Sequence, residues 1–534
     1  MAGHFDFIVV GAGSAGCVLA SRLSADPDVT VLLIEAGGHD DDPRITTPAR
    51  FGALPNTRFD WGFRTAPQPA LHNRQIAYPR GRCIGGTGSI NYMIYLRGHP
   101  SDYDHWRQLG CAGWGWNDVL PYFKRAEAFH AGGEAAIHGT DGPLEINEQS
   151  ERYALTEMFL AACQQAGLPF NVDLNGRDIE GCGYFPATIS GNERGSTARA
   201  YLRPARTRSN LTVVTGATAT GLAIEGRRVT GVDYVVGGQG HQARADRETI
   251  LAAGAIGSPH LLQISGIGPA DRLRAAGVTV RHDLPGVGEN LHDHLHYRAR
   301  WEITEPLSPF GRDAAATQSI EARYEQDRSG PLSTNHFESG AFLCSGPEIS
   351  VPDIELLMIP YFISLGAPEL RPPERHGFTI SGFPTRPRSR GRVGIVSDDP
   401  FDRPEIDPGY LTDPHDAQVM INLVRRARDI ANQVAFDPIR GAEITPGPAV
   451  ESDAQLLADI REMSSTSFHP VGSCRMGMDE MAVVDPALRV RGLEGLRIAD
   501  ASVMPEMNTG HPNAPTIMIA EKAADMMLAG SSQT

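Results

Sequence analysis

The sequence lacks the features that mark membrane-spanning, secreted and nucleic-acid-binding proteins. No apolar run approaches the roughly 20 residues of a spanning helix, and the first residues lead into a predicted strand without a signal-peptide pattern. The seven cysteines are an odd number without a C-x-x-C pair, which is typical of a reducing compartment. The formal net charge of -16 argues against a nucleic-acid or anionic-membrane surface. We therefore expect a cytoplasmic protein with no transmembrane segment and no nucleic-acid partner.

The chain of 534 residues is too long for a single hydrophobic core, so we expect two or more domains. A hydrophobic content of 41% and a charged content of 21% are typical of globular proteins. The sequence contains no internal repeat and no low-complexity segment.

The first 36 residues predict a strand–turn–helix unit that binds a dinucleotide. The apolar run 7–10 is typical of a buried parallel strand, and it ends at a complete G-x-G-x-x-G motif. In that motif Gly11 makes the tight turn, Gly13 lets the backbone approach a pyrophosphate, and Gly16 lets helix and strand pack closely. The helix that begins here directs its N-terminus at the phosphates.

A second apolar run, residues 30–34, ends in Glu35, whose carboxylate is suited to bind an adenosine ribose hydroxyl. The alternative interpretation, a glycine-rich turn in an α/β core, leaves Glu35 unexplained. Glycine-rich residues 79–104 bring the backbone close to something flat or bulky, and we favour a cofactor contact there over a simple hinge.

Further along the chain, apolar runs 211–214 and 229–236 are interpreted as a strand and its hairpin partner. From about residue 301 the pattern changes, and segments 353–358 and 377–380 alternate as half-exposed antiparallel strands do. A buried strand ending at Asp500 and a helix from about Pro515 then return the chain to the first domain.

The histidines at 292, 294 and 296 suggest a metal site, but no supporting set of ligands accompanies them. We therefore expect no metal.

The fingerprint and two further motifs resemble the glucose–methanol–choline family of flavin-dependent oxidoreductases over almost the whole length. One signature covers residues 81–91 with a continuation to 104, and the other covers residues 254–268. His469-Pro470 and the segment 513–516 also agree with the family. The chain looks most similar to the bacterial choline, sorbose and polyethylene-glycol dehydrogenase branch.

The resemblance implies an α/β fold, α+β overall, in which a Rossmann-like FAD domain carries a substrate domain built on an antiparallel sheet flanked by helices. The expected FAD-binding domain comprises residues 1–155, 206–300 and 463–534, and the expected substrate-binding domain comprises residues 156–205 and 301–462. Covalently flavinylated members have a histidine directly before Asn91. Ile90 stands there, so we expect non-covalent FAD.

Matching positions imply a set of residues that hold the flavin cofactor. These are Gly11, Gly13, Ser14, Ala15, Gly16, Glu35, Ala36, Gly86, Asn91, Met93, Ala219, Asp500, Ala501 and Thr516.

The same matching assigns His469 as the general base that removes the hydroxyl proton of an alcohol, since an imidazole titrates near neutral pH. Asn513 is expected to hydrogen-bond the developing alkoxide, with His511 as the competitor for that role. In the substrate pocket, Glu338 is a candidate to face a cation, although a purely structural carboxylate is at least as plausible. Phe468 replaces the tyrosine of choline-oxidising relatives, which weakens a choline assignment.

The resulting hypothesis is FAD-dependent oxidation of a primary alcohol to the aldehyde by hydride transfer to flavin N5. The partners would be a small-molecule alcohol and an electron acceptor, either a quinone-like or dye-like molecule or O₂. Three alternatives stay open: an O₂-using oxidase, a lyase or photodecarboxylase on the same scaffold, and a non-catalytic dinucleotide-binding module. The alcohol, the acceptor and the oligomeric state are not specified by the sequence.

Overall fold

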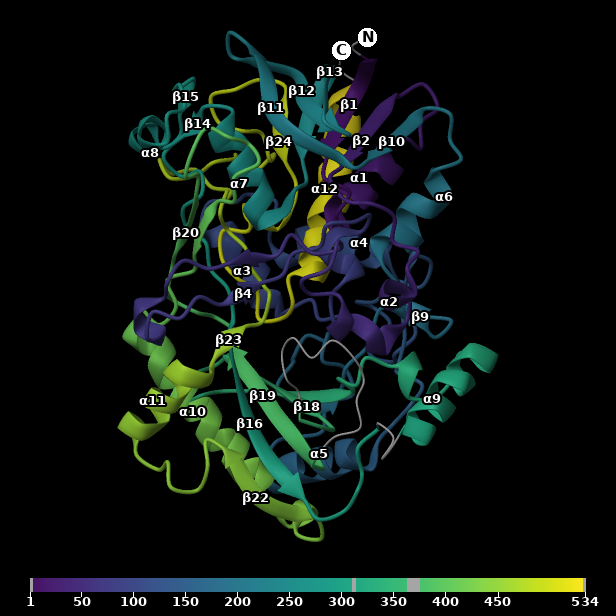
Figure 1. Ribbon diagram of the computed structural model, residues 1–534, viewed down its shortest axis with the longest axis vertical. Helices are drawn as coiled ribbons and strands as arrows, with labels where there is room; N and C mark the ends of the chain where they lie inside the picture. Colours follow the sequence, from purple (N-terminus) through teal and green to yellow (C-terminus); the bar gives the residue numbers. More distant parts are fainter. Residues whose placement is uncertain (1–2, 310–313, 363–374, 532–534) are drawn as a thin grey trace.

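Two large sheets, one above the other in Figure 1, organise the chain. The computed structural model describes residues 3–309, 314–362 and 375–531. Within these residues each of the two sheets has seven strands. The upper sheet is largely parallel and the lower one is antiparallel, each with helices against it, so the predicted α/β and α+β architecture is confirmed.

The upper sheet has the order β10-β2-β1-β13-β12-β11, and β24 pairs with β13. Strands β10, β2, β1 and β13 pair in parallel, and β2 and the second half of β1 are apolar because both of their faces are covered. The strands are β1 (Gly3–Val10), β2 (Val31–Glu35), β10 (Leu211–Thr215), β11 (Ala217–Glu225), β12 (Arg228–Val236), β13 (Gln239–Leu251) and β24 (Leu496–Ile498).

The expected pairing of runs 211–214 and 229–236 is wrong. Strand β10 pairs in parallel with β2, whereas β12 forms its antiparallel hairpin with β11. Strand β11 alternates small and polar residues at half-buried positions, which hid it from a search for apolar runs.

Helices α1 (Ser14–Leu23) and α12 (Asn513–Ser531) pack on each other against this sheet, and α4 (Trp116–Ala126) packs on α12. In Figure 1, α12 runs down from the upper end, where both chain ends lie, to the middle of the molecule. The C-terminal helix therefore delivers its first residues to the region between the two sheets.

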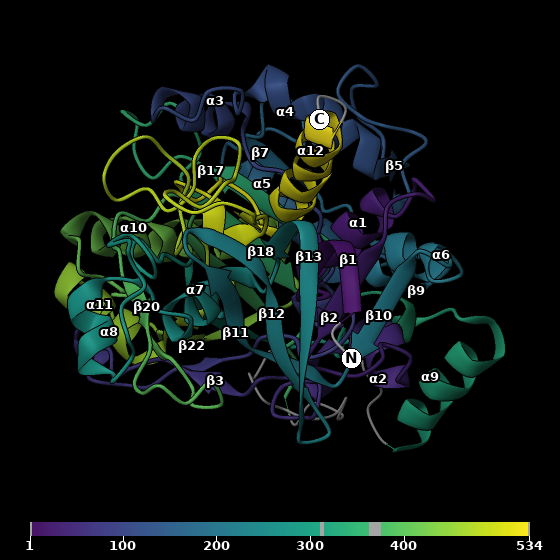
Figure 2. The same ribbon diagram turned by 90° about the horizontal axis from the view of Figure 1, so that it is seen from above.

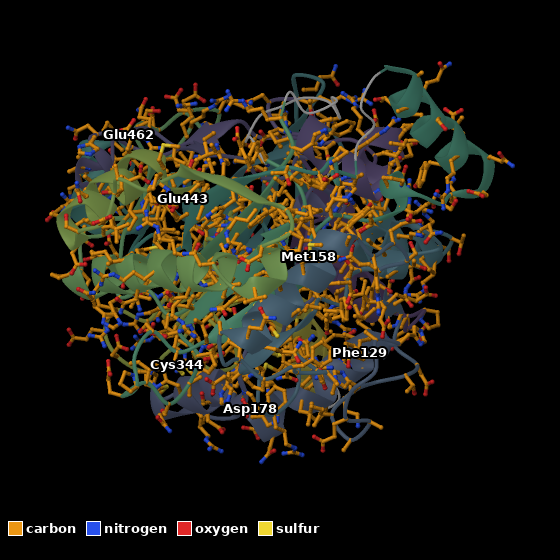
Figure 3. The ribbon with its side chains drawn as sticks, turned by 90° about the horizontal axis from the view of Figure 1, so that it is seen from below. Phe129, Met158, Asp178, Cys344, Glu443 and Glu462 are labelled. Carbon is orange, nitrogen blue, oxygen red and sulfur yellow. The ribbon has the colours of Figure 1, made fainter. Side chains whose placement is uncertain are left out.

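The lower sheet has the order β22-β16-β19-β18-β17-β7, and the short strand β23 pairs with β16. The strands are β7 (Gly181–Tyr184), β16 (Leu295–Ile303), β17 (Ser339–Leu343), β18 (Ile354–Ile359), β19 (Gly377–Pro384), β22 (Arg440–Thr445) and β23 (Ser465–Thr466). Helices α5 (Ala154–Gln165), α10 (Pro414–Ala431) and α11 (Asp453–Met463) cover its outer face. Figure 3 shows α5, with Met158, and α10 side by side across that face.

Segments 353–358 and 377–380 were expected to be half-exposed, and this is wrong. All residues of β18 and β19 are buried. Alternate side chains pack under α5 and α10, and the others pack with Phe51 and Ile94 from the upper half of the chain. Both faces of the sheet are covered, so both sets of alternate side chains are buried. In a sheet with one face in solvent, only one set would be.

Packing at two of the expected domain boundaries differs from the simplest form of the expected division. Residues 198–205, which were assigned to the substrate-binding domain, pack in the core of the upper sheet through Ala198, Tyr201, Leu202 and Ala205. Strand β16 begins at Leu295, so the lower sheet starts before residue 301. The division into two domains stays a prediction.

The other elements are shorter or lie at the periphery, and in Figures 1 and 2 helix α9 lies at the rim of the molecule. The remaining helices are α2 (Pro43–Thr46), α3 (Pro100–Gln108), α6 (Arg203–Ala205), α7 (Gly254–Ile264), α8 (Ala270–Ala275) and α9 (Ala314–Asp327). The remaining strands are β3 (Phe63–Arg64), β4 (Ala77–Tyr78), β5 (Glu127–Phe129), β6 (Leu144–Ile146), β8 (Ile189–Ser190), β9 (Glu193–Arg194), β14 (Ile267–Gly268), β15 (His282–Asp283), β20 (Arg392–Gly394) and β21 (Glu405–Asp407). Among the described helices, none combines the length and the apolar character needed to cross a bilayer.

Candidate functional site

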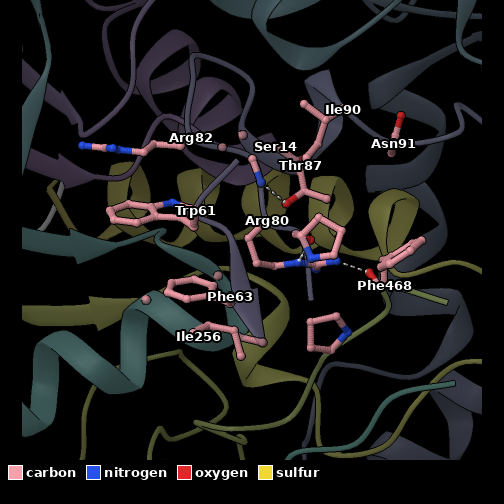
Figure 4. Close-up of a pocket in the computed structure, with 18 of the residues that line it drawn as sticks. Ser14, Trp61, Phe63, Arg80, Arg82, Thr87, Ile90, Asn91, Ile256 and Phe468 are labelled. Carbon is pink, nitrogen blue, oxygen red and sulfur yellow. Dashed lines mark hydrogen bonds between the residues drawn. The ribbon is translucent and has the colours of Figure 1, made fainter. Parts of the chain in front are cut away.

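A cavity of about 1410 Å³ runs from the glycine-rich turn after β1 to the inner face of the lower sheet. Its walls come from segments far apart in the chain: the turn after β1, residues 79–94, the start of α7, and the segments before α12. Figure 4 shows part of the wall, where Trp61 and Phe63 stack with their ring centroids 5.7 Å apart. Ligand pockets for drug-sized molecules hold about 300–1,000 Å³, so this cavity has room for a dinucleotide and a second, smaller molecule.

Most of the residues expected to bind the cofactor line this cavity. They are Gly11, Gly13, Ser14, Ala15, Glu35, Ala36, Gly86, Asn91, Met93, Ala219, Asp500, Ala501 and Thr516. Gly16 is not among the lining residues. A Cβ at Gly16 would lie 1.8 Å from the carbonyl oxygen of Gly11, so this glycine permits helix α1 to pack on the turn.

The second glycine-rich segment lies directly on the first. The N–H of Gly85 donates to the carbonyl of Ala12 at 2.7 Å, and a Cβ at Gly86 would lie 2.7 Å from the Cα of Gly13. Asn91 is held in place by Arg194, whose Nη1 donates to Asn91 Oδ1 at 2.8 Å. These contacts explain the density of glycine here, because a side chain would separate the two backbone segments.

Glu35 closes the turn after β1 as well as lining the cavity. Its Oε2 accepts from the N–H of Ala12 at 2.9 Å, and its Oε1 accepts from the N–H of Gly37 at 2.8 Å. Burial raises the pKa of the Glu35 carboxyl to about 7, although the two backbone donors oppose that shift. The carboxylate therefore orders the glycine turn in addition to facing the cavity.

The two residues expected in the substrate pocket, Phe468 and Glu338, have different positions. Phe468 lines the cavity, and its carbonyl accepts a hydrogen bond of 2.7 Å from Nη2 of Arg80 (Figure 4). Glu338 is not among the lining residues, so the structure does not support its expected contact with a substrate cation. Its Oε2 instead accepts from Thr156 Oγ1 at 2.7 Å and from the N–H of Tyr153 at 3.1 Å, which ties β17 to the start of α5.

His469 lies in the cavity wall above a buried carboxylate. Its backbone N–H donates to Oδ1 of Asp293 at 2.7 Å. Oδ2 of Asp293 accepts from the hydroxyl groups of Tyr78, Tyr410 and Thr466 at 2.5–2.9 Å. Both carboxylate oxygens of Asp293 are hydrogen-bonded, so Asp293 holds the loop that carries His469 in one position.

A chain of hydrogen bonds determines which nitrogen of His469 is free to accept a proton. His294 Nε2 lies 2.9 Å from the carbonyl oxygen of Thr385, and a carbonyl only accepts, so this nitrogen carries the hydrogen. Burial lowers the pKa of His294 to about 3, so the ring is neutral and its Nδ1 is an acceptor. Nδ1 of His469 lies 3.0 Å from that acceptor and must be its donor. The lone pair of His469 is therefore on Nε2.

The electrostatic surroundings keep His469 neutral. Burial lowers the pKa of His469 well below its ordinary value, and the neighbouring His511, His294 and Arg80 lower it further. A neutral imidazole with a free Nε2 is able to accept a proton throughout the physiological pH range.

The ring beside His469 is that of His511, the competitor of Asn513 for the second catalytic role, and the choice between the two residues stays a prediction. The ring centroids of His469 and His511 are 4.7 Å apart. His511 is held from behind by Glu355, whose Oε1 lies 2.9 Å from His511 Nε2. Asn513 also lines the cavity, but its Nδ2 donates to Ser14 Oγ at 2.8 Å, which fastens the start of α12 to the glycine turn.

The histidine run that suggested a metal site has other roles. His292 Nδ1 lies 2.7 Å from the carbonyl of Asn290, and His294 contacts His469. Within the described part of the chain, no group of three or more histidine, cysteine, aspartate or glutamate side chains is placed to hold a metal.

Several residues of the site were missed in the sequence. His294 and Asp293 were noticed only as members of a histidine-rich run, and nothing in the sequence around Thr385 distinguishes its carbonyl. The one available signal was that the polar residues 292–294 lead into residues 295–303, where apolar and polar residues alternate.

Comparisons with known proteins place these features in a family. Residues 5–296 and 387–520 match the N-terminal and C-terminal family profiles that are both described as GMC oxidoreductase. The chain is 41% identical over 533 residues to an alcohol dehydrogenase [acceptor] of Pseudomonas putida, covering 98% of this chain and 96% of the relative. It is 42% identical over 527 residues to an oxygen-dependent choline dehydrogenase of Rhizobium etli, covering 98% and 95%.

Two solved structures are similar over nearly their whole length. Pyridoxine 4-oxidase from Mesorbium loti has a TM-score of 0.88 at 35% identity, covering 98% of each chain. A formate oxidase has a TM-score of 0.93 at 27% identity, covering 100% of this chain and 99% of the other.

Proposed function

The chain belongs to the GMC oxidoreductase family, FAD-dependent enzymes acting on CH–OH donors, and we propose that it oxidises a primary alcohol to the aldehyde. The observation that carries this proposal is the hydrogen-bonded chain from the Thr385 carbonyl through His294 to His469. It leaves a neutral imidazole with an accepting Nε2 in the wall of the cavity, which is the group that proton removal from a hydroxyl requires.

The residues of the cavity fit FAD. The two glycine segments meet without side chains between them, as a closely bound pyrophosphate requires, and α1 begins beside them. Ser14, Glu35 and Ala219 would hold the adenine dinucleotide half, and Asn91, Met93 and Thr516 would lie at the flavin. Bound FAD supplies the acceptor for the hydride that leaves the carbinol carbon.

The chain's own residues then have distinct tasks. His469 accepts the hydroxyl proton at Nε2, and Asp293 keeps its loop in place through the backbone N–H. His511, beside it, contacts the alcohol oxygen as negative charge develops there. Asn513 anchors α12 to Ser14, so its contribution is to the cofactor end of the site.

The direct test is anaerobic flavin bleaching. The purified yellow protein should lose its flavin colour when mixed with a panel of primary alcohols in the absence of oxygen, and NAD should not substitute for the flavin. A protein whose flavin is not reduced by any alcohol would contradict the proposal.

The second half-reaction separates a dehydrogenase from an oxidase. The name of the Pseudomonas putida relative specifies an acceptor, and those of two structural relatives specify oxidases. We propose a quinone-like acceptor with O₂ as the alternative, and reoxidation of the bleached enzyme by a quinone-like dye or by air decides between them. The His469–His511 pair argues against a photodecarboxylase, whose carboxylate substrate has no hydroxyl proton to remove, and flavin bleaching by alcohols separates an oxidoreductase from a lyase. The seven unpaired cysteines are consistent with the proposed cytoplasmic location.

We expect the FAD to be non-covalent. Ile90 lines the cavity directly before Asn91, and its side chain cannot form a bond to the flavin. Acid or heat denaturation should therefore release the yellow colour into the supernatant after the protein is removed. Colour that remains with the precipitate would overturn this expectation.

Replacing Glu35 by glutamine should weaken FAD retention while leaving the fold intact. Glutamine keeps the shape, but its amide nitrogen would face the N–H of Ala12 or Gly37, and a lost charge-assisted hydrogen bond costs roughly 1.5–3 kcal/mol. We expect the FAD dissociation constant to rise at least about tenfold, measured by fluorescence of released flavin. The matched control is Glu321→Gln, a cavity-lining but half-exposed carboxylate on α9. Equal FAD retention by the two variants would contradict the role of Glu35.

A further inference from the structure

The part of the cavity next to His469 and His511 is enclosed by aromatic rings. Tyr92 stacks on Phe337 with centroids 4.9 Å apart, and the edge of Phe468 meets Tyr92 at 6.1 Å. Phe383 lies 5.6 Å from His469 and 6.1 Å from His511. Such walls favour a flat, apolar substrate body beside the reacting carbon, because ring contacts add to the gain from burying apolar area.

A third histidine lies in this enclosure. His296, on β16, lines the cavity, is 5% exposed, and meets the same Phe383 ring edge-on with the centroids 5.6 Å apart. Its Nε2 has no hydrogen-bond partner among the described residues, and the proposed mechanism does not use it. A buried polar atom without a partner in a ligand cavity is a place where a ligand atom supplies the missing hydrogen bond.

Arg298 lies next to His296 and determines whether the Nε2 of His296 is a donor or an acceptor. Its Nη2 is 3.5 Å from His296 Nδ1, and a guanidinium is only a donor, so Nδ1 is the accepting nitrogen. Burial together with the Arg298 charge lowers the pKa of His296 well below its ordinary value, so the ring is neutral. Its hydrogen is therefore on Nε2, which is a donor.

The charge behind this wall is positive. Arg298 is 6% exposed, and among the described residues no carboxylate is within ion-pairing distance of its guanidinium. The carboxylates nearby contact other groups: Glu355 Oε1 contacts His511, Asp293 contacts the loop of His469, and Glu338 Oε2 contacts Thr156, while the second oxygens of Glu355 and Glu338 have no partner among the described residues. A cationic group at His296 would approach an uncompensated guanidinium in a poorly solvated place, where repulsion is only weakly screened.

We propose that His296, positioned by Arg298, is a specificity-determining residue that selects aromatic primary alcohols carrying a hydrogen-bond acceptor and rejects alcohols with a quaternary ammonium group. The Nε2–H of His296 donates to an oxygen or ring nitrogen of the substrate on the side away from the hydroxyl. This inference rests on the proposed alcohol oxidation at His469 and adds the substrate class to it.

The charge part of the proposal is tested on the unaltered holoenzyme with choline and 3,3-dimethylbutan-1-ol. These alcohols have nearly the same shape, and the trimethylammonium group of one replaces the tert-butyl group of the other. In anaerobic stopped-flow experiments we expect the neutral alcohol to reduce the flavin on the order of 100-fold faster per mole of substrate. Arg298→Leu should narrow that ratio, and Arg300→Leu, a matched substitution farther along β16, should narrow it less. Choline reducing the flavin as fast as its neutral isostere would overturn the proposal.

The hydrogen-bond part is tested with pyridin-4-ylmethanol and benzyl alcohol, which differ by one ring nitrogen. The unaltered enzyme should prefer the pyridine about tenfold in flavin reduction per mole of substrate, because one neutral hydrogen bond is at stake. His296→Phe should abolish the preference, and His296→Gln, which keeps a side-chain N–H, should restore part of it. An unchanged ratio in His296→Phe would exclude His296 as the donor.

A binding measurement keeps the result independent of turnover. Isonicotinamide and benzamide carry the same rings without an oxidisable hydroxyl, and their dissociation constants follow from their perturbation of the flavin spectrum. The unaltered holoenzyme should bind isonicotinamide about tenfold more tightly than benzamide, and His296→Phe should bind the two compounds equally. If no alcohol reduces the flavin but this binding preference is present, the proposed oxidation fails and the subsite stands. If alcohols reduce the flavin without either preference, the subsite fails and the oxidation stands.

Discussion

His469→Ala is expected to retain FAD and to lose flavin reduction by alcohol, with the rate of the reductive half-reaction falling 10²–10⁴-fold. General-base removal costs that factor, which corresponds to about 3–5 kcal/mol of transition-state stabilisation. FAD retention is expected because the contacts of His469 are with Asp293, His294 and His511 and not with the glycine turn. Anaerobic stopped-flow absorbance measures the rate, and the absorption spectrum of the purified variant measures FAD occupancy.

The matched control for this variant is His260→Ala, since His260 also lines the cavity but lies on α7. A comparable loss of flavin reduction in the control would show that the effect on His469 is not specific.

The pH profile offers an independent check on the same residue. A lowered pKa means that the accepting form of His469 prevails at every pH above that value. We therefore expect the reduction rate to be flat from about pH 6.5, the ordinary value for histidine, upward, and to fall only in more acidic solution. A rate that rises steeply between pH 7 and pH 8 would contradict the neutral, buried imidazole.

His511→Ala is expected to slow flavin reduction about 10²-fold, and Asn513→Ala much less. The ring of His511 lies beside His469, so we expect it to contact the alcohol oxygen, and removing one such contact costs roughly 10²–10³-fold. Asn513 donates to Ser14, so its removal should appear mainly as weaker FAD binding. Stopped-flow reduction and FAD dissociation constants of both variants separate the two roles.

This expectation reverses the order inferred from the sequence motif. If Asn513→Ala loses most of its flavin reduction rate and His511→Ala keeps nearly all of it, the pairing of His469 with Asn513 is right. The assignment of His511 from the position of its ring would then be wrong. His511→Gln serves as the intermediate case, because glutamine is able to keep a hydrogen bond to Glu355.

The parts of the fold that were predicted are those that local patterns encode. The strand, glycine turn and helix at residues 7–23 follow from spacing and apolar runs. The exposure of β18 and β19 was mispredicted because it depends on what covers the sheet. Phe51 and Ile94, which cover one face, are about 260–330 residues away in sequence, and no local pattern encodes their position on the sheet.

The candidate site, like the fold, could be predicted only where a local sequence pattern encodes it. Motif matching pointed to His469 and to most of the residues that line the cavity, and it favoured Asn513, the first residue of α12, over His511, two residues before it. Only the direction in which α12 enters the site determines which of them meets His469. Likewise, Glu338 has the right chemistry for a cation but is used to tie β17 to α5.

Strand β16 and the residue before it have a consequence for how relatives of this enzyme diverge. Leu295, Tyr297 and Ala299 enter the core under α10, whereas His296 and Arg298 point the other way, on the side of His294. Because the alternation has a period of two, an insertion or deletion of one residue here would exchange catalytic and core faces together. Substitutions at positions 296 and 298 do not change which residues point to the cavity and which point to the core. We therefore expect evolutionary change in substrate choice to accumulate at these alternate positions, with the length of the segment held constant.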